Sequence, residues 1–305
     1  MRARGACVLL ALAAGGCELQ EVTVVDFAHV VVGEVYVTLR TPGNSVQAFV
    51  HGTAAGGTPD SETFDDAVVS IARDDGFTFD LVLAGVGACV DSLADGARGS
   101  CFIADPADAG ALAPGDQLDL AIDLADGRRL LGALTIPGDF QISGIPLPSC
   151  RLVPDTLLEL TWTRSAGAWA YVNETSINGL FAALRPEGIE AGDPLYLFGL
   201  SISATDTTVV FPSQFGVFDR FDLDQDLALR LQRGLPDGTD ADVTITAVER
   251  NYVNWARGGN FNPSGQVRVA SLRGDGTGVF GAAVVRRFSV VTSSTPGGAP
   301  DCPLS

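Results

Sequence analysis

Apolar and polar side chains alternate along much of this 305-residue chain. The clearest example is the segment 118–124, where every second residue is Leu or Ile and the residues between them are Asp or Ala. A period of two predicts a strand that buries one face. The Asp-Gly pair at 126–127 then predicts a tight turn into a second strand at 128–137.

The rest of the first half follows the same pattern. β-Branched or alternating runs lie at 29–40, 45–53 and 67–83, and Asp74-Asp75-Gly76 predicts a hairpin turn within the last of them. Short strands with a turn about every ten residues are typical of β-sandwiches. We therefore expect an immunoglobulin-like sandwich over residues 29–145.

Three prolines between residues 143 and 155 interrupt the strand pattern and predict a domain boundary. Beyond it, the alternating segment 157–172 predicts another hairpin. Its residues Trp162 and Tyr171, on either side of a glycine-containing turn, resemble the start of a fibronectin type III domain.

Later runs predict further strands of the second half, at 195–205 and 227–233 and in the stretches GVFGAAV and RRFSVV. The expected fold class is all-β, with two antiparallel β-sandwich domains. The second, fibronectin-III-like and with a short helix, covers 150–294. The remaining tail, 295–305, is expected to be held by a disulfide.

The apolar pattern becomes helical at 250–257 (RNYVNWAR), which fits one or two turns that end at two glycines. Aromatic rings, amides and a guanidinium gather here, as they do on surfaces that bind a sugar or a peptide. The candidate ligand-binding residues are Arg250, Tyr252, Asn254, Trp255 and Asn260. Alternatively, the two rings lie three residues apart on one helical face and cover the sandwich core.

The first seventeen residues, MRARGACVLLALAAGGC, have the layout of a secretory signal. Their apolar run is shorter than the ~20 residues that a membrane-spanning helix needs. Small residues followed by Cys17 resemble a bacterial lipobox, in which the cysteine is lipidated, although Ala14 stands where Leu is usual. We expect a lipoprotein signal at 1–17 and a tether at 18–28; the alternative is a secreted protein cut near Gly16.

Four cysteines remain after this signal, and an even number in an exported protein predicts two disulfides. Three pairings are open, and we favour Cys89–Cys101, which closes a short loop, with Cys150–Cys302, which holds the tail. The chain has no C-x-x-C pair and two histidines, so no metal site is expected.

Charge and motifs narrow the classes of function. A net charge of −18 disfavours nucleic acid and anionic lipid, so membrane contact is expected through the lipid anchor only. The chain has no G-x-S-x-G motif, and the acidic run at 219–226 lacks the Gly and Glu of an EF-hand loop. Neither enzymatic activity nor a cofactor is expected; the alternative is a hydrolase with an unrecognised carboxylate pair.

Five stretches carry a family resemblance: AAGGC at 13–17, DAVVSIARDDG at 66–76, APGDQLDLAIDLADGRRL at 113–130, AVERNYVNW at 247–255 and GDGTGVFGAAV at 274–284. They resemble bacterial outer-membrane lipoproteins of unassigned function that often accompany TonB-dependent receptors. The resemblance implies an immunoglobulin-like domain, a second β domain and an outer-membrane anchor, and no catalytic residues.

The expected function is that of a non-enzymatic envelope lipoprotein beside an outer-membrane transporter. Its partner would be a TonB-dependent receptor or a nutrient such as a glycan. A structural or adhesive envelope protein is the main alternative. Glu18, rather than Asp, follows the cysteine, which suits lipid anchoring to the outer membrane.

Overall fold

The computed structural model describes residues 30–53, 62–90, 98–145, 148–201, 203–214, 224–258 and 269–303. The strands are β1 (Val31–Leu39), β2 (Ser45–Gly52), β3 (Val68–Arg73), β4 (Thr78–Ala84), β5 (Ser100–Ile103), β6 (Gln117–Asp123), β7 (Arg129–Thr135), β8 (Ser149–Leu152), β9 (Leu158–Thr161), β10 (Ala170–Asn178), β11 (Leu195–Leu200), β12 (Thr208–Phe211), β13 (Asp240–Val248), β14 (Arg273–Gly274) and β15 (Gly276–Thr292). The helices are α1 (Pro106–Gly110), α2 (Leu180–Leu184), α3 (Gln225–Leu231) and α4 (Arg250–Gly258), with short 3-10 turns η1 (Val86–Ala88) and η2 (Arg185–Glu187). The prediction of a mainly β fold is confirmed. The signal, Cys17, the tether and Asn260 lie outside the described residues.

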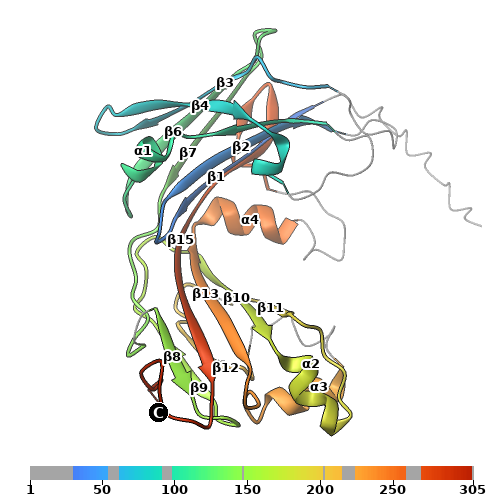
Figure 1. The fold of residues 1–305 in the computed structure, drawn as a ribbon. Helices are drawn as coiled ribbons and strands as arrows, with labels where there is room; N and C mark the ends of the chain where they lie inside the picture. Colours follow the sequence, from blue (N-terminus) through green and yellow to red (C-terminus); the bar gives the residue numbers. More distant parts are fainter. Residues whose placement is uncertain are drawn as a thin grey trace, which may run out of the picture.

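One long strand, β15, connects the two halves of the molecule (Figure 1). Its first part pairs in parallel with β1, and its second part pairs antiparallel with β13. The sequence predicts two strands in this region, but the structure has one strand of 17 residues. The apolar run continues across Val285 without a turn residue, so nothing in the chain interrupts the strand.

A 13-stranded sheet results, in the order β11-β10-β13-β15-β1-β2-β5-β4-β3-β6-β7-β14, with β8 also paired to β15. β1 and β8 run parallel to β15, so the sheet is mixed and the prediction of purely antiparallel sandwiches is wrong. Parallel pairing is possible because long connections separate these strands in the sequence. The division into two separate sandwich domains is not confirmed, because one sheet runs through both halves.

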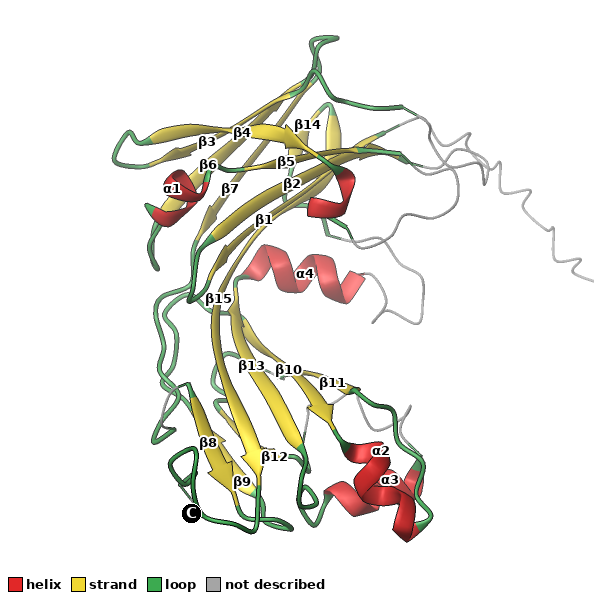
Figure 2. Cartoon of the chain, viewed as in Figure 1, coloured by secondary structure: helices red, strands yellow, loops and turns green. Residues whose placement is uncertain are grey.

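In the upper half of Figure 2 the sheet folds back over its own face. Val31, Val35 and Val37, at alternate positions of β1, are buried in this layer. Here β7 lies close to β15: a Cβ atom added to Gly132 would lie 3.2 Å from Phe280 Cβ. One cluster of buried apolar residues continues from this half into the lower one.

In the lower half, β9 and β12 form a separate two-stranded sheet beside the large one. Buried Tyr171 and Ile245 belong to the large sheet, and buried Leu160 and Phe211 belong to the small one; all four share the core. Val172, the neighbour of Tyr171, packs in a different cluster with Val253 of α4. Figure 2 shows α4 in the hollow of the bent sheet. One face of β10 therefore packs in the core between the two sheets, and the other face packs against α4.

The predicted hairpin at 157–172 is wrong. β9 pairs with β12, whereas β10 pairs with β11 and β13, so the two strands lie in different sheets. The rings of Trp162 and Tyr171 contact one another edge to face, with centroids 5.3 Å apart. An alternating pattern identifies a half-buried strand but does not identify its partner.

The predicted strand at 227–233 is also wrong, because most of this segment belongs to α3. The carboxylate of Asp224 accepts hydrogen bonds from two backbone N–H groups at the start of the helix. Leu227, Arg230 and Leu231 are buried, with the spacing of three and four residues that one helical face requires. The cap and this spacing decide for a helix over a strand.

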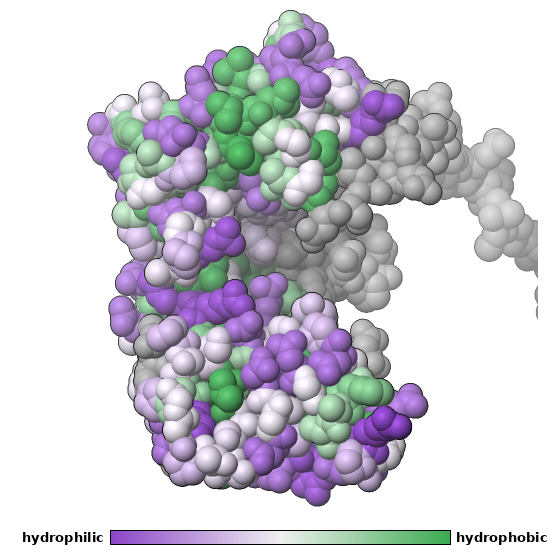
Figure 3. All heavy atoms as spheres, in the orientation of Figure 1, coloured by the Kyte–Doolittle hydropathy of each residue, from purple (hydrophilic) through white to green (hydrophobic). Residues whose placement is uncertain are grey.

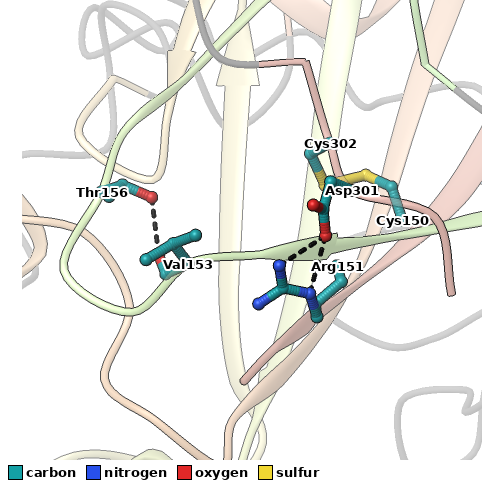
Figure 4. The surroundings of a disulfide bond; sticks show 6 residues. All are labelled: Cys150, Arg151, Val153, Thr156, Asp301 and Cys302. Atoms are coloured by element: carbon teal, nitrogen blue, oxygen red, sulfur yellow. Dashed lines mark hydrogen bonds and ion pairs between the residues drawn. A yellow bond between two sulfur atoms is a disulfide. The ribbon is translucent and has the colours of Figure 1, made fainter. Parts of the chain in front are cut away.

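Both expected disulfides are present. They are Cys89–Cys101 and Cys150–Cys302. Figure 4 shows Arg151 beside the second one, with its guanidinium against the carboxylate of Asp301 at 2.5 Å. The backbone N–H of Cys302 also donates to the carbonyl of Arg151 at 2.8 Å. A covalent bond, an ion pair and backbone hydrogen bonds together fix the tail against β8.

Candidate functional site

A pocket of about 250 Å³ lies between the large and the small sheet of the lower half. We call it the inter-sheet pocket. Its main walls are Trp162, Tyr171, Asn173, Ser201, Asp206 and Gln214. They come from β10 and from the ends of β9, β11 and β12, so distant parts of the sequence meet here.

Two aromatic rings form the apolar wall of this pocket. Tyr171 makes edge contacts with Trp162 and, at a centroid distance of 5.8 Å, with Phe140. The Tyr171 hydroxyl accepts a hydrogen bond from the backbone N–H of Ser165 at 2.8 Å. Ring contacts and the hydrogen bond to the hydroxyl therefore fix the Tyr171 side chain, and this wall of the pocket is ordered before any ligand binds.

Two amides of the polar wall carry NH₂ groups from which no described residue accepts a hydrogen bond. Asn173 is only 8% exposed, and its carboxamide oxygen accepts one long bond of 3.5 Å from the Thr175 hydroxyl. Its NH₂ group donates to no partner within the described ranges. Gln214 likewise makes no side-chain hydrogen bond to a described residue. In contrast, Ser201 accepts from the backbone N–H of Tyr171 at 2.8 Å and supports the wall.

The residues predicted on α4 separate into different surroundings. Trp255 is 8% exposed and packs with Val32 and Val279. This agrees with the alternative interpretation, in which the aromatic rings of the helix cover the core. The ring of Tyr252 contacts the ring of Tyr36 edge to face, with centroids 5.6 Å apart. The Trp255 ring thus packs against β1 and β15 and does not line the inter-sheet pocket.

The two polar candidates of α4 that are described lie nearer the surface. Arg250 is exposed and places its guanidinium 5.3 Å from the ring centroid of Trp169, an exposed residue just before β10. Asn254 is half-buried on the helix. A ligand-binding role for this patch stays a prediction.

Glu249, which directly precedes α4, is the polar group that holds the helix in the hollow. It is 6% exposed, and its carboxylate accepts from the backbone N–H groups of Asn251 at 2.5 Å and Tyr252 at 2.7 Å. Burial raises the pKa of this carboxyl, although the backbone donors act in the opposite direction. The side chain of Asn251 also donates to the carbonyls of Ala133 and Phe280, which ties α4 to β7 and β15.

Replacing Glu249 by alanine should lower the free energy of unfolding by about 2 kcal/mol at low pH, because three backbone N–H groups, those of Asn251, Tyr252 and Ala282, lose their acceptor. Folding raises the pKa of the carboxyl, so its contribution is complete below the ordinary value of 4.5 and is lost as the pH rises through the raised value. Urea denaturation across this pH range should show that the difference in the free energy of unfolding between wild type and Glu249→Ala becomes smaller as the pH rises. Glu159→Ala, at an exposed carboxyl on β9, is the control. A difference that widens with pH would contradict this assignment.

The described residues contain no group of three or more His, Cys, Asp or Glu side chains placed to hold a metal ion. None of the described helices is long and apolar enough to cross a membrane. Figure 3 shows a face on which hydrophilic and hydrophobic residues are mixed, with hydrophobic ones gathered on the upper half. Exposed apolar residues of that half include Val68, Val82 and Leu83, on β3 and β4.

No protein-family model matches this chain, and no curated protein matches it. The resemblance to outer-membrane lipoproteins therefore stays a prediction, and the inter-sheet pocket has to be interpreted from its own residues.

Sequence reasoning missed this pocket. A partial signal is present in β10, where Tyr171 and Asn173 occupy the same face of an alternating strand. Asp206 and Gln214, on either side of β12, carry no such signal. Their approach to β10 depends on the pairing of β12 with β9, which local patterns do not specify.

Proposed function

We propose that this chain is an exported, non-enzymatic envelope lipoprotein that binds a small neutral polar ligand of the sugar class in the inter-sheet pocket. The observation that carries the proposal is the pairing of an aromatic wall with two amides, Asn173 and Gln214, whose NH₂ groups donate to no residue in the described ranges. Aromatic rings offer apolar faces to a sugar, and amide and carboxylate groups bind its hydroxyls. Two disulfides indicate an oxidising location outside the cytosol.

Lipid anchoring through Cys17 and work beside an outer-membrane transporter complete the proposal. A folded domain anchored to the membrane through lipidated Cys17 would present its ligand to a neighbouring receptor. The TonB-dependent class of receptor fits this role. The immunoglobulin-like and fibronectin-like character of the two halves belongs to the same proposal. A recovered β-barrel receptor in a pull-down of tagged full-length protein from solubilised outer membranes would support it; the Cys17→Ser variant should leave the membrane fraction.

Calorimetric titration with neutral mono- and disaccharides, namely glucose, galactose, mannose and maltose, tests ligand binding. We expect saturable binding of at least one sugar, weakened about tenfold or more in Asn173→Leu, which removes the buried donor. Asn254→Leu, at the amide on α4, is the matched control and should bind as wild type does. Binding of none of these sugars, or loss in Asn254→Leu alone, would contradict the pocket assignment; the first result would favour the structural or adhesive alternative.

A further inference from the structure

A second cavity lies on the opposite face of the large sheet, beside α4. It has a volume of about 450 Å³, and we call it the α4 groove. Its polar walls are Arg40, Glu174, Thr244, Thr246, Tyr252 and Arg287. Neighbouring residues of a strand point to opposite faces, so Glu174 faces this groove while Asn173 faces the inter-sheet pocket. The two sites are therefore separate.

Two opposite charges in the α4 groove have no charged partner among the residues that the structure describes. Neither the Glu174 carboxylate nor the Arg40 guanidinium forms an ion pair with a residue in the described ranges. The hydrogen bond that Arg40 makes through its side chain goes to the carbonyl of Gly43, at 3.3 Å. Arg287, by contrast, is neutralised by Asp242 at 2.6 Å. The groove thus holds one negative and one positive group that a ligand could neutralise.

The environment of Glu174 supports a role in binding a cation. The Glu174 side chain is exposed, but neighbouring atoms of the groove remove part of its hydration and so raise the pKa of its carboxyl. Its charge adds to burial in raising the pKa of the Tyr252 hydroxyl. An aromatic ring beside a carboxylate is a favourable place for an ammonium group, because the ring face attracts cations. Thr244 lies directly opposite Glu174 on the neighbouring strand and offers a hydroxyl acceptor.

We propose that the α4 groove binds a small zwitterion of the amino-acid type, with its ammonium group on Glu174 and its carboxylate on Arg40. Arginine binds carboxylates through two parallel N–H donors, which suits the second contact. The apolar part of the ligand would lie against Pro42, Ala283 and Val285, which line the same groove. This site is independent of the sugar site proposed above, since the two lie on different faces of β10.

Leucine and leucyl-leucine are the probes, because they carry the same two charges at a short and a longer separation. Calorimetric titration should show saturable binding of at least one of them. The reference ligand is whichever of the two probes binds more tightly. Leucine methyl ester lacks the carboxylate, and N-acetyl-leucine lacks the ammonium group. Each should bind roughly tenfold to a hundredfold more weakly than the reference ligand. The variants Glu174→Gln and Arg40→Gln should each bind the tighter of the two probes more weakly than wild type does, by a similar factor.

Both substituted residues are exposed, so their variants should keep the melting temperature of wild type. Asn173→Leu, in the inter-sheet pocket, should bind the zwitterion as wild type does, which separates failure of this proposal from failure of the sugar proposal. Binding of neither probe overturns the proposal. Binding that both charge variants leave unchanged, or a methyl ester that binds as tightly as the zwitterion, also overturns it.

Discussion

Removing the Cys150–Cys302 disulfide should lower the free energy of unfolding by about 5 kcal/mol. The bond joins residues 152 positions apart, and the loop-closure model assigns long loops the largest effect on the unfolded chain. It also holds the tail that hydrogen-bonds to Arg151 of β8. A loss of this size is comparable with the whole stability of many domains, so the double variant Cys150→Ala/Cys302→Ala should unfold at much lower urea.

The second disulfide of the chain supplies the matched control. Cys89–Cys101 spans 12 positions, so the variant Cys89→Ala/Cys101→Ala should lose about 3 kcal/mol in the same model. Urea denaturation of both double variants under non-reducing conditions measures the comparison. A larger loss for the short loop than for the long one would contradict the account of the tail.

Replacing Gly278 by alanine should lower the free energy of unfolding by at least about 4 kcal/mol. Gly278 lies on β15 directly opposite Gly33 of β1, in the parallel pair that joins the halves. Its φ of +135° is one that residues with a Cβ rarely adopt, and an added Cβ would overlap the carbonyl oxygen of Gly33 and lie 2.8 Å from its carbonyl carbon. Backbone cannot move aside as a flexible side chain can, so the strand pair would have to separate.

Gly87→Ala is the control for this variant, because a Cβ at Gly87 meets no atom within 4 Å and its φ is not in the left-handed region. Thermal unfolding followed by circular dichroism should place the control within about 0.5 kcal/mol of wild type. If Gly278→Ala melts at the wild-type temperature, the pairing of β1 with β15 is wrong.

The parts of this fold that depend on neighbouring residues could be predicted from the sequence. The hairpin of β6 and β7 follows from strict alternation around an Asp-Gly turn, and α4 follows from a change of period at Arg250. Loop composition and the position of the tail favoured the observed disulfide pairing among the three that four cysteines allow. Each of these features is decided within a short stretch or by a few cysteines.

The parts that depend on distant partners could not be predicted. β1 and β15 are more than 230 residues apart, so the continuous sheet has no local signature. β9 and β10 alternate in the same way and yet belong to different sheets, because alternation does not specify a partner. The walls of the inter-sheet pocket follow from those pairings, so the aromatic and amide residues on α4 were the more visible candidates in the sequence.

Strand β10 contributes to both proposed sites. Tyr171 and Asn173 face the inter-sheet pocket, whereas Glu174 faces the α4 groove. One face of β10 is aromatic and amide-bearing, and the other carries a carboxylate that forms no ion pair with a described residue. The chemistry of the two faces therefore predicts two ligands of different classes, a neutral polar one and a zwitterion.

Hydrogen–deuterium exchange with and without sugar, at the highest concentration of the titration, tests most directly whether a ligand occupies the inter-sheet pocket. Ligand contacts slow the opening of the strands that hold them, so we predict slower exchange in β9, β10 and β12. Exchange in β3 and β6 of the upper half should not change. Unchanged exchange throughout, or slowing confined to the upper half, would contradict the proposed site.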